Sequence, residues 1–142
     1  MKKFFILTSF ICAMIFTATA SAANWSSLGK DNFGNEYFLD TESVSLYKHE
    51  GNRTMFYVSF KTVFSDSGRK KLEQENLASV VSLYAFANNN GQKLSAELSI
   101  RATALDGSLI DEMQANSPKW AKINPNSVIE AIYEEAYKYL RL

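Results

Sequence analysis

One stretch decides the fold: residues 54–64 read TMFYVSFKTVF. Aromatic and β-branched side chains recur there at every second position, which places them on one face of an extended strand. The residues of that face are Phe56, Val58, Phe60, Thr62 and Phe64. The residues of the opposite face are Met55, Tyr57, Ser59, Lys61 and Val63. This alternation predicts a half-buried strand of an antiparallel sheet.

Further strands are predicted on both sides of this stretch. Residues 80–86 are apolar, residues 88–91 read NNNG, and residues 93–103 alternate again, which predicts a hairpin. In its second strand, the side chains expected on one face are Leu94, Ala96, Leu98, Ile100 and Ala102. Shorter strands are predicted at residues 25–28, 36–39 and 109–113. Residues 40–43 suit a tight turn or a single helical turn, and residues 69–76 a loop or one or two helical turns.

The C-terminal region changes to a helical period. Ser127 and Glu130 have the spacing of a capping box, which predicts the start of a helix that runs to about Leu140. The apolar stripe of this helix consists of Val128, Ile132, Ala136 and Tyr139. The predicted fold class is therefore α+β: an antiparallel sheet of about five to six strands, covered by a C-terminal helix, in a single domain of residues 23–142.

Residues 1–22 have the layout of a secretory signal peptide. Lys2 and Lys3 precede an apolar segment at residues 4–16, and Ala20 and Ala22 suit a cleavage site after Ala22. The apolar segment is too short for a stable membrane span, and the residues before Cys12 do not match a lipid-attachment site. An N-terminal anchor left uncut is the alternative. The pattern predicts an exported protein without a stable membrane anchor, located in the periplasm, at the cell surface or outside the cell.

The charge of the chain is balanced. Removal of Lys2 and Lys3 leaves 13 basic residues against 15 acidic ones, a net charge of −2. A nucleic-acid binder needs a strong excess of basic side chains on one surface, so the composition argues against that class. The one local cluster is Arg69, Lys70 and Lys71, the candidate site for an anion or a protein partner. A solvated surface is the plainer interpretation of three adjacent cations.

The sequence has few residues suited to catalysis. His49 is the only histidine and lies in a polar segment that predicts a turn, where a histidine is usually solvated. Cys12 is the only cysteine and leaves with the signal peptide. The pairs Asp111-Glu112 and Glu134-Glu135 diverge, because adjacent side chains on a strand or a helix point in different directions. We therefore expect no catalytic residue, no metal site and no cofactor, and hence no enzyme.

Several segments resemble one family of exported bacterial domains. They are Trp25, Glu36-Tyr37-Phe38-Leu39-Asp40 with Ser43-Val44, Ala104-Leu105-Asp106-Gly107, and Lys119-Trp120-Ala121-Lys122-Ile123-Asn124-Pro125-Asn126-Ser127 with Glu130-Ala131-Ile132-Tyr133. On these segments the chain is similar to the surface-adhesin protein E family over nearly all of residues 23–142. The resemblance implies an antiparallel sheet packed with a C-terminal helix. It also implies binding of host extracellular-matrix or serum proteins at the cell surface.

The chain departs from that family at one pair of positions. Family members often carry a cysteine on the strand before the central hairpin and another near the chain end. This chain has Ala87-Asn88 and Ala136-Tyr137 in the corresponding regions. The resemblance therefore implies the same fold without a disulfide that contributes about 2–4 kcal/mol.

Two functional classes follow from the sequence. The first is an exported, non-enzymatic binding module of the adhesin kind, whose partner is a host matrix or envelope protein. The alternative is a soluble periplasmic envelope protein with a structural, inhibitory or chaperone-like role, which the lack of a lipid anchor favours. Tyr133, Tyr137 and Tyr139 cannot all face the sheet, and an exposed tyrosine suits either a protein partner or a homodimer.

Overall fold

An eight-stranded antiparallel sheet forms most of this computed structural model, which describes residues 23–142. The strands are β1 (Trp25–Lys30), β2 (Glu36–Asp40), β3 (Ser45–Glu50), β4 (Arg53–Val63), β5 (Leu77–Asn89), β6 (Gln92–Ala104), β7 (Leu109–Gln114) and β8 (Ala121–Lys122). The helices are the 3-10 turn η1 (Thr41–Ser43), α2 (Asp66–Leu72) and α3 (Val128–Tyr137). The predicted signal peptide at residues 1–22, with Cys12, lies outside the described residues. No helix within residues 23–142 combines the length and apolarity needed to cross a membrane.

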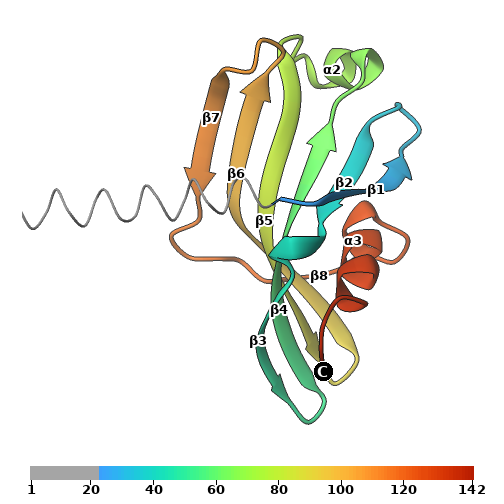
Figure 1. Cartoon of the computed structure of the whole chain (residues 1–142), viewed down its shortest axis with the longest axis vertical. Helices are drawn as coiled ribbons and strands as arrows, with labels where there is room; N and C mark the ends of the chain where they lie inside the picture. The colour runs from blue at the N-terminus through green and yellow to red at the C-terminus, as the bar shows by residue number, and fades with distance from the viewer. Residues whose placement is uncertain (1–22) are drawn as a thin grey trace, which may run out of the picture.

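The strands pair in the order β1-β2-β4-β5-β6-β7, and two short strands extend this sheet. β3 pairs with the first half of β4 and β2 with its second half, because the chain turns at η1 between them. In the same way, β8 pairs with β6 near its start and β7 pairs with it further along. The long strands β4, β5 and β6 therefore form the centre of the sheet, with shorter strands on both sides (Figure 1).

β4 confirms the alternation read from its sequence. Its buried side chains are Thr54, Phe56, Val58, Phe60 and Thr62. α3 lies against this side of the sheet, which we name the helix face (Figure 1). The ring of Phe56 lies 5.4 Å from that of Tyr133 on α3 and 5.5 Å from that of Phe86 on β5, measured between centroids. The core residues from both layers are Leu39, Phe56, Val58, Phe60, Phe86, Ile132, Tyr133 and Ala136.

α3 begins where the capping box predicts. The hydroxyl of Ser127 accepts a hydrogen bond from the N–H of Glu130 at 3.2 Å. The carboxylate of Glu130 accepts one from the N–H of Asn126 at 3.1 Å. The N–H of Glu130 lies in the first turn and has no carbonyl partner inside the helix, and the N–H of Asn126 precedes the helix. Each bond gives one of these groups an acceptor. α2 has the same kind of start, since the hydroxyl of Ser65 accepts from the N–H of Gly68 at 3.0 Å.

The buried stripe of α3 differs in part from the prediction. Ile132 and Ala136 are fully buried as expected, and Tyr133 is buried beside them. Val128 and Tyr139 were also expected in the stripe, but they are 37% and 44% exposed. The helix ends at Tyr137 rather than near Leu140, so the backbone no longer turns Tyr139 toward the sheet.

The sheet has eight strands, so the expectation of five to six is wrong. The two strands missing from the prediction are β3 and β8. Every residue of β3 is exposed, and a strand without a buried side lacks the alternation that would reveal it. β8 has only two residues, which is too short for any pattern.

The sequence predicts that the apolar side chains of β6 all lie on one face of the sheet, and a β-bulge in β6 makes this prediction wrong. Leu98 is an extra residue there, because Tyr84 pairs with Glu97 whereas Leu83 pairs with Ser99. One extra residue moves all the following side chains to the other face of a sheet. Leu94 and Ala96, before the bulge, therefore lie on the opposite side from Ile100 and Ala102, after it.

The docking of α3 predicts a large loss of stability for a cavity beneath it. Ile132 is fully buried, so Ile132→Ala should lower the free energy of unfolding by about 2–5 kcal/mol. Ser127→Ala removes only the cap and should lower it by about 1 kcal/mol. Urea unfolding followed by circular dichroism measures both values. A loss for Ile132→Ala no larger than that for Ser127→Ala would mean that α3 is not docked on the sheet.

Candidate protein-binding surface

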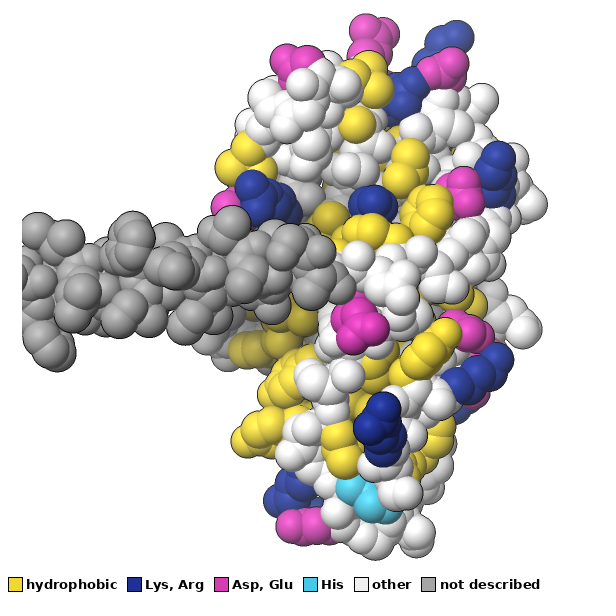
Figure 2. Space-filling model, viewed as in Figure 1, with side chains coloured by type: hydrophobic (Ala, Val, Ile, Leu, Met, Phe, Trp, Pro, Cys, Tyr) yellow, Lys and Arg dark blue, Asp and Glu magenta, His cyan; other side chains and the backbone are white. Residues whose placement is uncertain are grey.

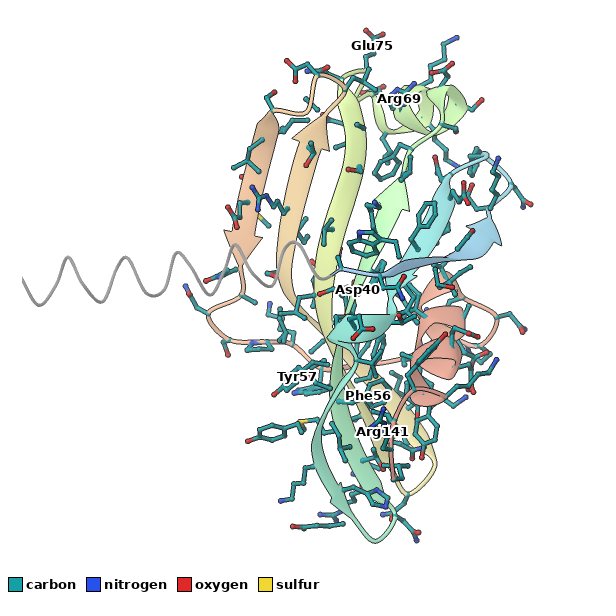
Figure 3. The ribbon with its side chains drawn as sticks, viewed as in Figure 1. Asp40, Phe56, Tyr57, Arg69, Glu75 and Arg141 are labelled. Atoms are coloured by element: carbon teal, nitrogen blue, oxygen red, sulfur yellow. The ribbon has the colours of Figure 1, made fainter. Side chains whose placement is uncertain are left out.

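The side of the sheet opposite the helix face carries large side chains that α3 does not cover. We name this side the open face. Phe56 and Tyr57 are consecutive on β4 and point to opposite sides, Phe56 toward α3 and Tyr57 away from it (Figure 3). Lys61 is half-buried on this face, together with the large apolar side chains of Trp25, Phe38, Met55, Tyr57, Val81, Leu83 and Leu94. Arg101 lies on the same face and is exposed.

One row of directly paired residues crosses the open face. Phe38 of β2 pairs with Lys61 of β4, and Lys61 pairs with Val81 of β5. Val81 pairs with Arg101 of β6, which pairs with Glu112 of β7. Neighbouring strands lie about 4.8 Å apart, so the backbones at Lys61 and Arg101 are separated by about 10 Å. The row thus has an apolar side chain between two cations and an aromatic ring at one end.

Lys61 is held by aromatic rings. Its ammonium nitrogen lies 4.6 Å from the centroid of the Trp25 ring and 5.4 Å from that of Phe38. Both distances are within the range of a cation–π interaction, which stabilises the charge without neutralising it. Among residues 23–142, no carboxylate forms an ion pair with Lys61. Lys61 is half-buried as a residue, and its positive charge has no acidic partner among the described residues.

Tyrosines extend the aromatic surface toward β3. The rings of Tyr47 and Tyr57 meet edge to face with centroids 5.7 Å apart, and Tyr47 is 64% exposed. Figure 2 shows hydrophobic side chains gathered over the middle of the sheet and over its lower part, with a cation enclosed among them. The surface is therefore a broad aromatic and apolar area with embedded positive charge.

The turn between β1 and β2 positions the two strands that bear Trp25 and Phe38. The carboxylate of Asp31 accepts from the N–H of Asn35 at 3.0 Å and from the hydroxyl of Tyr37 at 2.8 Å. Burial and the bond to Asp31 raise the pKa of Tyr37 to about 12. Desolvation opposes the charge of Asp31, but its hydrogen bonds from Tyr37 and Asn35 outweigh this effect and lower the pKa of the carboxyl.

The predicted candidates Arg69, Lys70 and Lys71 have different surroundings. All three lie on α2, where Arg69 forms an ion pair with Asp66 and donates to the carbonyl of Phe64 at 2.8 Å. The ammonium of Lys71 lies 3.8 Å from the ring centroid of Phe33. Lys70 is exposed. Arg69 thus holds the start of the helix. Arg69 and Lys70 line one hollow of about 410 Å³, but the carboxylates of Asp66 and Glu75 line it too.

The other titratable groups singled out in the sequence have local partners. His49 lies on β3 rather than in a turn, and its Nδ1 is 2.9 Å from the hydroxyl oxygen of Thr54. Asp111 and Glu112 lie on opposite faces of β7, and the Asp111 carboxylate accepts from the N–H of Glu112 at 2.8 Å. In the described part of the chain, no three His, Cys, Asp or Glu side chains gather closely enough to hold a metal ion.

A cleft of about 550 Å³ lies between η1 and the C-terminal end of the chain. Its lining residues are Asn24, Thr41, Glu42, Val44, Leu46, Tyr139, Leu140 and Arg141. Within residues 23–142, no buried side-chain nitrogen or oxygen lacks a hydrogen-bond partner. The cleft therefore has no unsatisfied buried group that calls for a ligand atom, and the open face is the stronger candidate site.

Comparisons of the chain with protein-family models, with curated proteins and with solved structures find no match. The open face is therefore interpreted from its own geometry and chemistry.

Asp31 contributes stability that depends on pH. Because folding lowers its pKa, the contribution is complete above the unfolded-state pKa of about 3.9 and is lost as the pH falls through the folded-state pKa. Asp31→Asn should lower stability at neutral pH and reduce the further loss on acidification. Urea unfolding of both proteins at neutral and acidic pH measures this, and parallel pH profiles would contradict it.

The two sides of β4 should differ in their contribution to stability. Phe56 is fully buried, so Phe56→Ala should lower the free energy of unfolding by about 3–5 kcal/mol. Tyr57 lies on the open face, so Tyr57→Ala should lower it by about 1 kcal/mol or less. Guanidinium unfolding measures both values. Equal losses would mean that the open face is part of a covered core and is not available to a partner.

Proposed function

We propose that this chain is an exported, non-enzymatic domain that binds another protein through its open face. The observation that carries the proposal is the one-sided cover of the sheet by α3, which leaves aromatic rings around Lys61 at the surface. Aromatic residues are enriched in protein interfaces, because a rigid ring supplies a large contact area at a small entropic loss.

The dimensions of the surface support a protein partner. From Trp25 on β1 to Arg101 on β6 the face crosses four strand spacings, about 19 Å, and from Met55 to Lys61 it extends about 20 Å along β4. The resulting footprint of roughly 400 Å² is within the range of the largest apolar patch on a typical monomeric protein, which is often functional. This footprint is about half of the surface area that one partner buries in an interface of standard size. Polar residues around the footprint would supply the remaining contact area.

The sequence supports the cellular setting of this proposal. The pattern of residues 1–22 favours export, and the resemblance to the surface-adhesin protein E family favours a host matrix or serum protein as the partner. A second candidate function is that of a soluble periplasmic envelope protein with a structural, inhibitory or chaperone-like role. The absence of a lipid-attachment pattern around Cys12 favours this candidate, because an adhesin must stay at the cell surface.

A binding experiment with two tyrosine variants tests the proposed surface. The exported protein is immobilised and exposed to serum and to envelope extract. Tyr57→Ser alters the open face, whereas Tyr139→Ser alters an exposed tyrosine near the cleft. We expect a captured protein that wild type and Tyr139→Ser retain and that Tyr57→Ser loses. Equal capture by all three proteins would contradict binding through the open face.

Fractionation of the producing cells separates the two candidate functions. Protein at the cell surface or in the medium, with a serum or matrix protein as the captured partner, supports the adhesin role. Protein confined to the periplasm, with an envelope protein as the captured partner, supports the second candidate.

A further inference from the structure

We infer that the open face binds an acidic segment of its protein partner, with carboxylates placed against Lys61 and Arg101. This inference rests on the proposed function and adds the chemistry of the partner to it. It follows from the two positive charges in the row that crosses β2, β4, β5, β6 and β7, and from the side chains that surround each of them.

Lys61 provides the first positive charge. Its ammonium lies against Trp25 and Phe38, at 4.6 and 5.4 Å from their ring centroids. No carboxylate of residues 23–142 lies within ion-pair distance of it. Aromatic rings fix the position of this cation and leave it unneutralised, so a carboxylate that approaches from solvent meets a charge already in place.

Arg101 provides the second positive charge. It is exposed and lies two strands away from Lys61, with Val81 between them. The spacing of about 10 Å suits two carboxylates on one partner segment that are separated by an apolar side chain above Val81. Glu112 is the only acidic residue of the row and pairs directly with Arg101 from the neighbouring strand β7, although no ion pair joins the two side chains within residues 23–142.

Two further acidic residues lie beside the row on β2, and both have local hydrogen-bond donors. Glu36 accepts a hydrogen bond from the hydroxyl of Ser27 at 2.7 Å. Asp40 accepts from the N–H groups of Asn24 and Glu42 at 3.0 and 3.1 Å. Positive charge therefore gathers at the centre of the open face, although residues 23–142 carry a net charge of −2. This local field favours acidic partners in the approach to the surface as well as in the bound state.

The same charges disfavour a second copy of this chain as the occupant. Two open faces packed against each other with their rows aligned bring Lys61 and Arg101 of one copy against the same cations of the other. Like charges held face to face oppose association. The chemistry of the row therefore selects an acidic and apolar segment of another protein.

Fluorescence of Trp25 provides a direct test. The sequence has two tryptophans, so Trp120→Phe leaves Trp25, in contact with Lys61, as the only reporter. The full-length exported protein is titrated with a short glutamate peptide of the repeat Glu-Ser-Val-Ser, which in an extended chain presents glutamate and valine on one face. It is titrated separately with a peptide that has lysine in place of glutamate. We expect a saturable change with the glutamate peptide only, weakened by salt because the charges are near the surface.

Charge variants identify the residues responsible. Lys61→Met and Arg101→Met keep the apolar stems and remove the charges, and each should weaken binding of the glutamate peptide roughly tenfold. Lys61→Arg keeps the charge and should retain most of the affinity. Lys70→Met removes an exposed cation of α2, away from the open face, and should leave the affinity unchanged. Circular dichroism melts establish that each variant is folded.

Three outcomes would overturn the inference. The first is an equal response to both peptides, and the second is unchanged affinity in both methionine variants. The third is Lys61-dependent binding to vesicles containing phosphatidylglycerol without any response to the glutamate peptide, which would assign the row to a membrane. The proposed function is distinguishable from these failures: it stands if Tyr57→Ser loses a captured protein that both methionine variants retain. It falls if Tyr57→Ser retains every captured protein.

Discussion

The packing of α3 on one side of the sheet is the constraint on which the rest of the structure depends. Phe56, Phe86 and Tyr133 meet there with ring centroids 5.4 to 5.7 Å apart. Aromatic pairs at these distances contribute beyond the area that they bury. All residues of the main core cluster belong to this single sheet–helix layer. A sheet with one such layer buries one face, so its second face keeps large side chains at the surface.

The open face is ordered by contacts within itself. Lys61 lies on two aromatic rings, Tyr47 meets Tyr57 edge to face, and Ala85 and Ala96 beside Tyr57 are buried although α3 lies on the other side. If the open face binds a partner as proposed, these contacts hold its side chains in place beforehand. Less side-chain entropy is then lost on association, and more of the contact energy appears as affinity.

Structural features that depend on residues close together in the sequence could be predicted. Features that depend on how distant strands pair could not. Alternation reveals β4, and the spacing of Ser127 and Glu130 reveals the start of α3, because both signals are local. The bulge at Leu98 leaves no such signal, and the exposed strand β3 has no buried side. The same limit applies to the candidate site. Adjacent cations at residues 69–71 stand out in the sequence, whereas Lys61 meets Trp25 and Phe38 only after three strands pair.

The position of α3 at the end of the chain has a consequence for the order of folding. Ile132, Tyr133 and Ala136 supply one whole side of the core, and they follow every strand of the sheet in the sequence. A growing chain therefore cannot complete its core until nearly all of it is available. The sheet that precedes α3 is built mostly from strands that are neighbours in the sequence, namely β1-β2, β4-β5, β5-β6 and β6-β7, so its pairings need no residue of α3. A chain that ends before α3 therefore leaves the apolar helix face, with Phe56 and Phe86, without its cover.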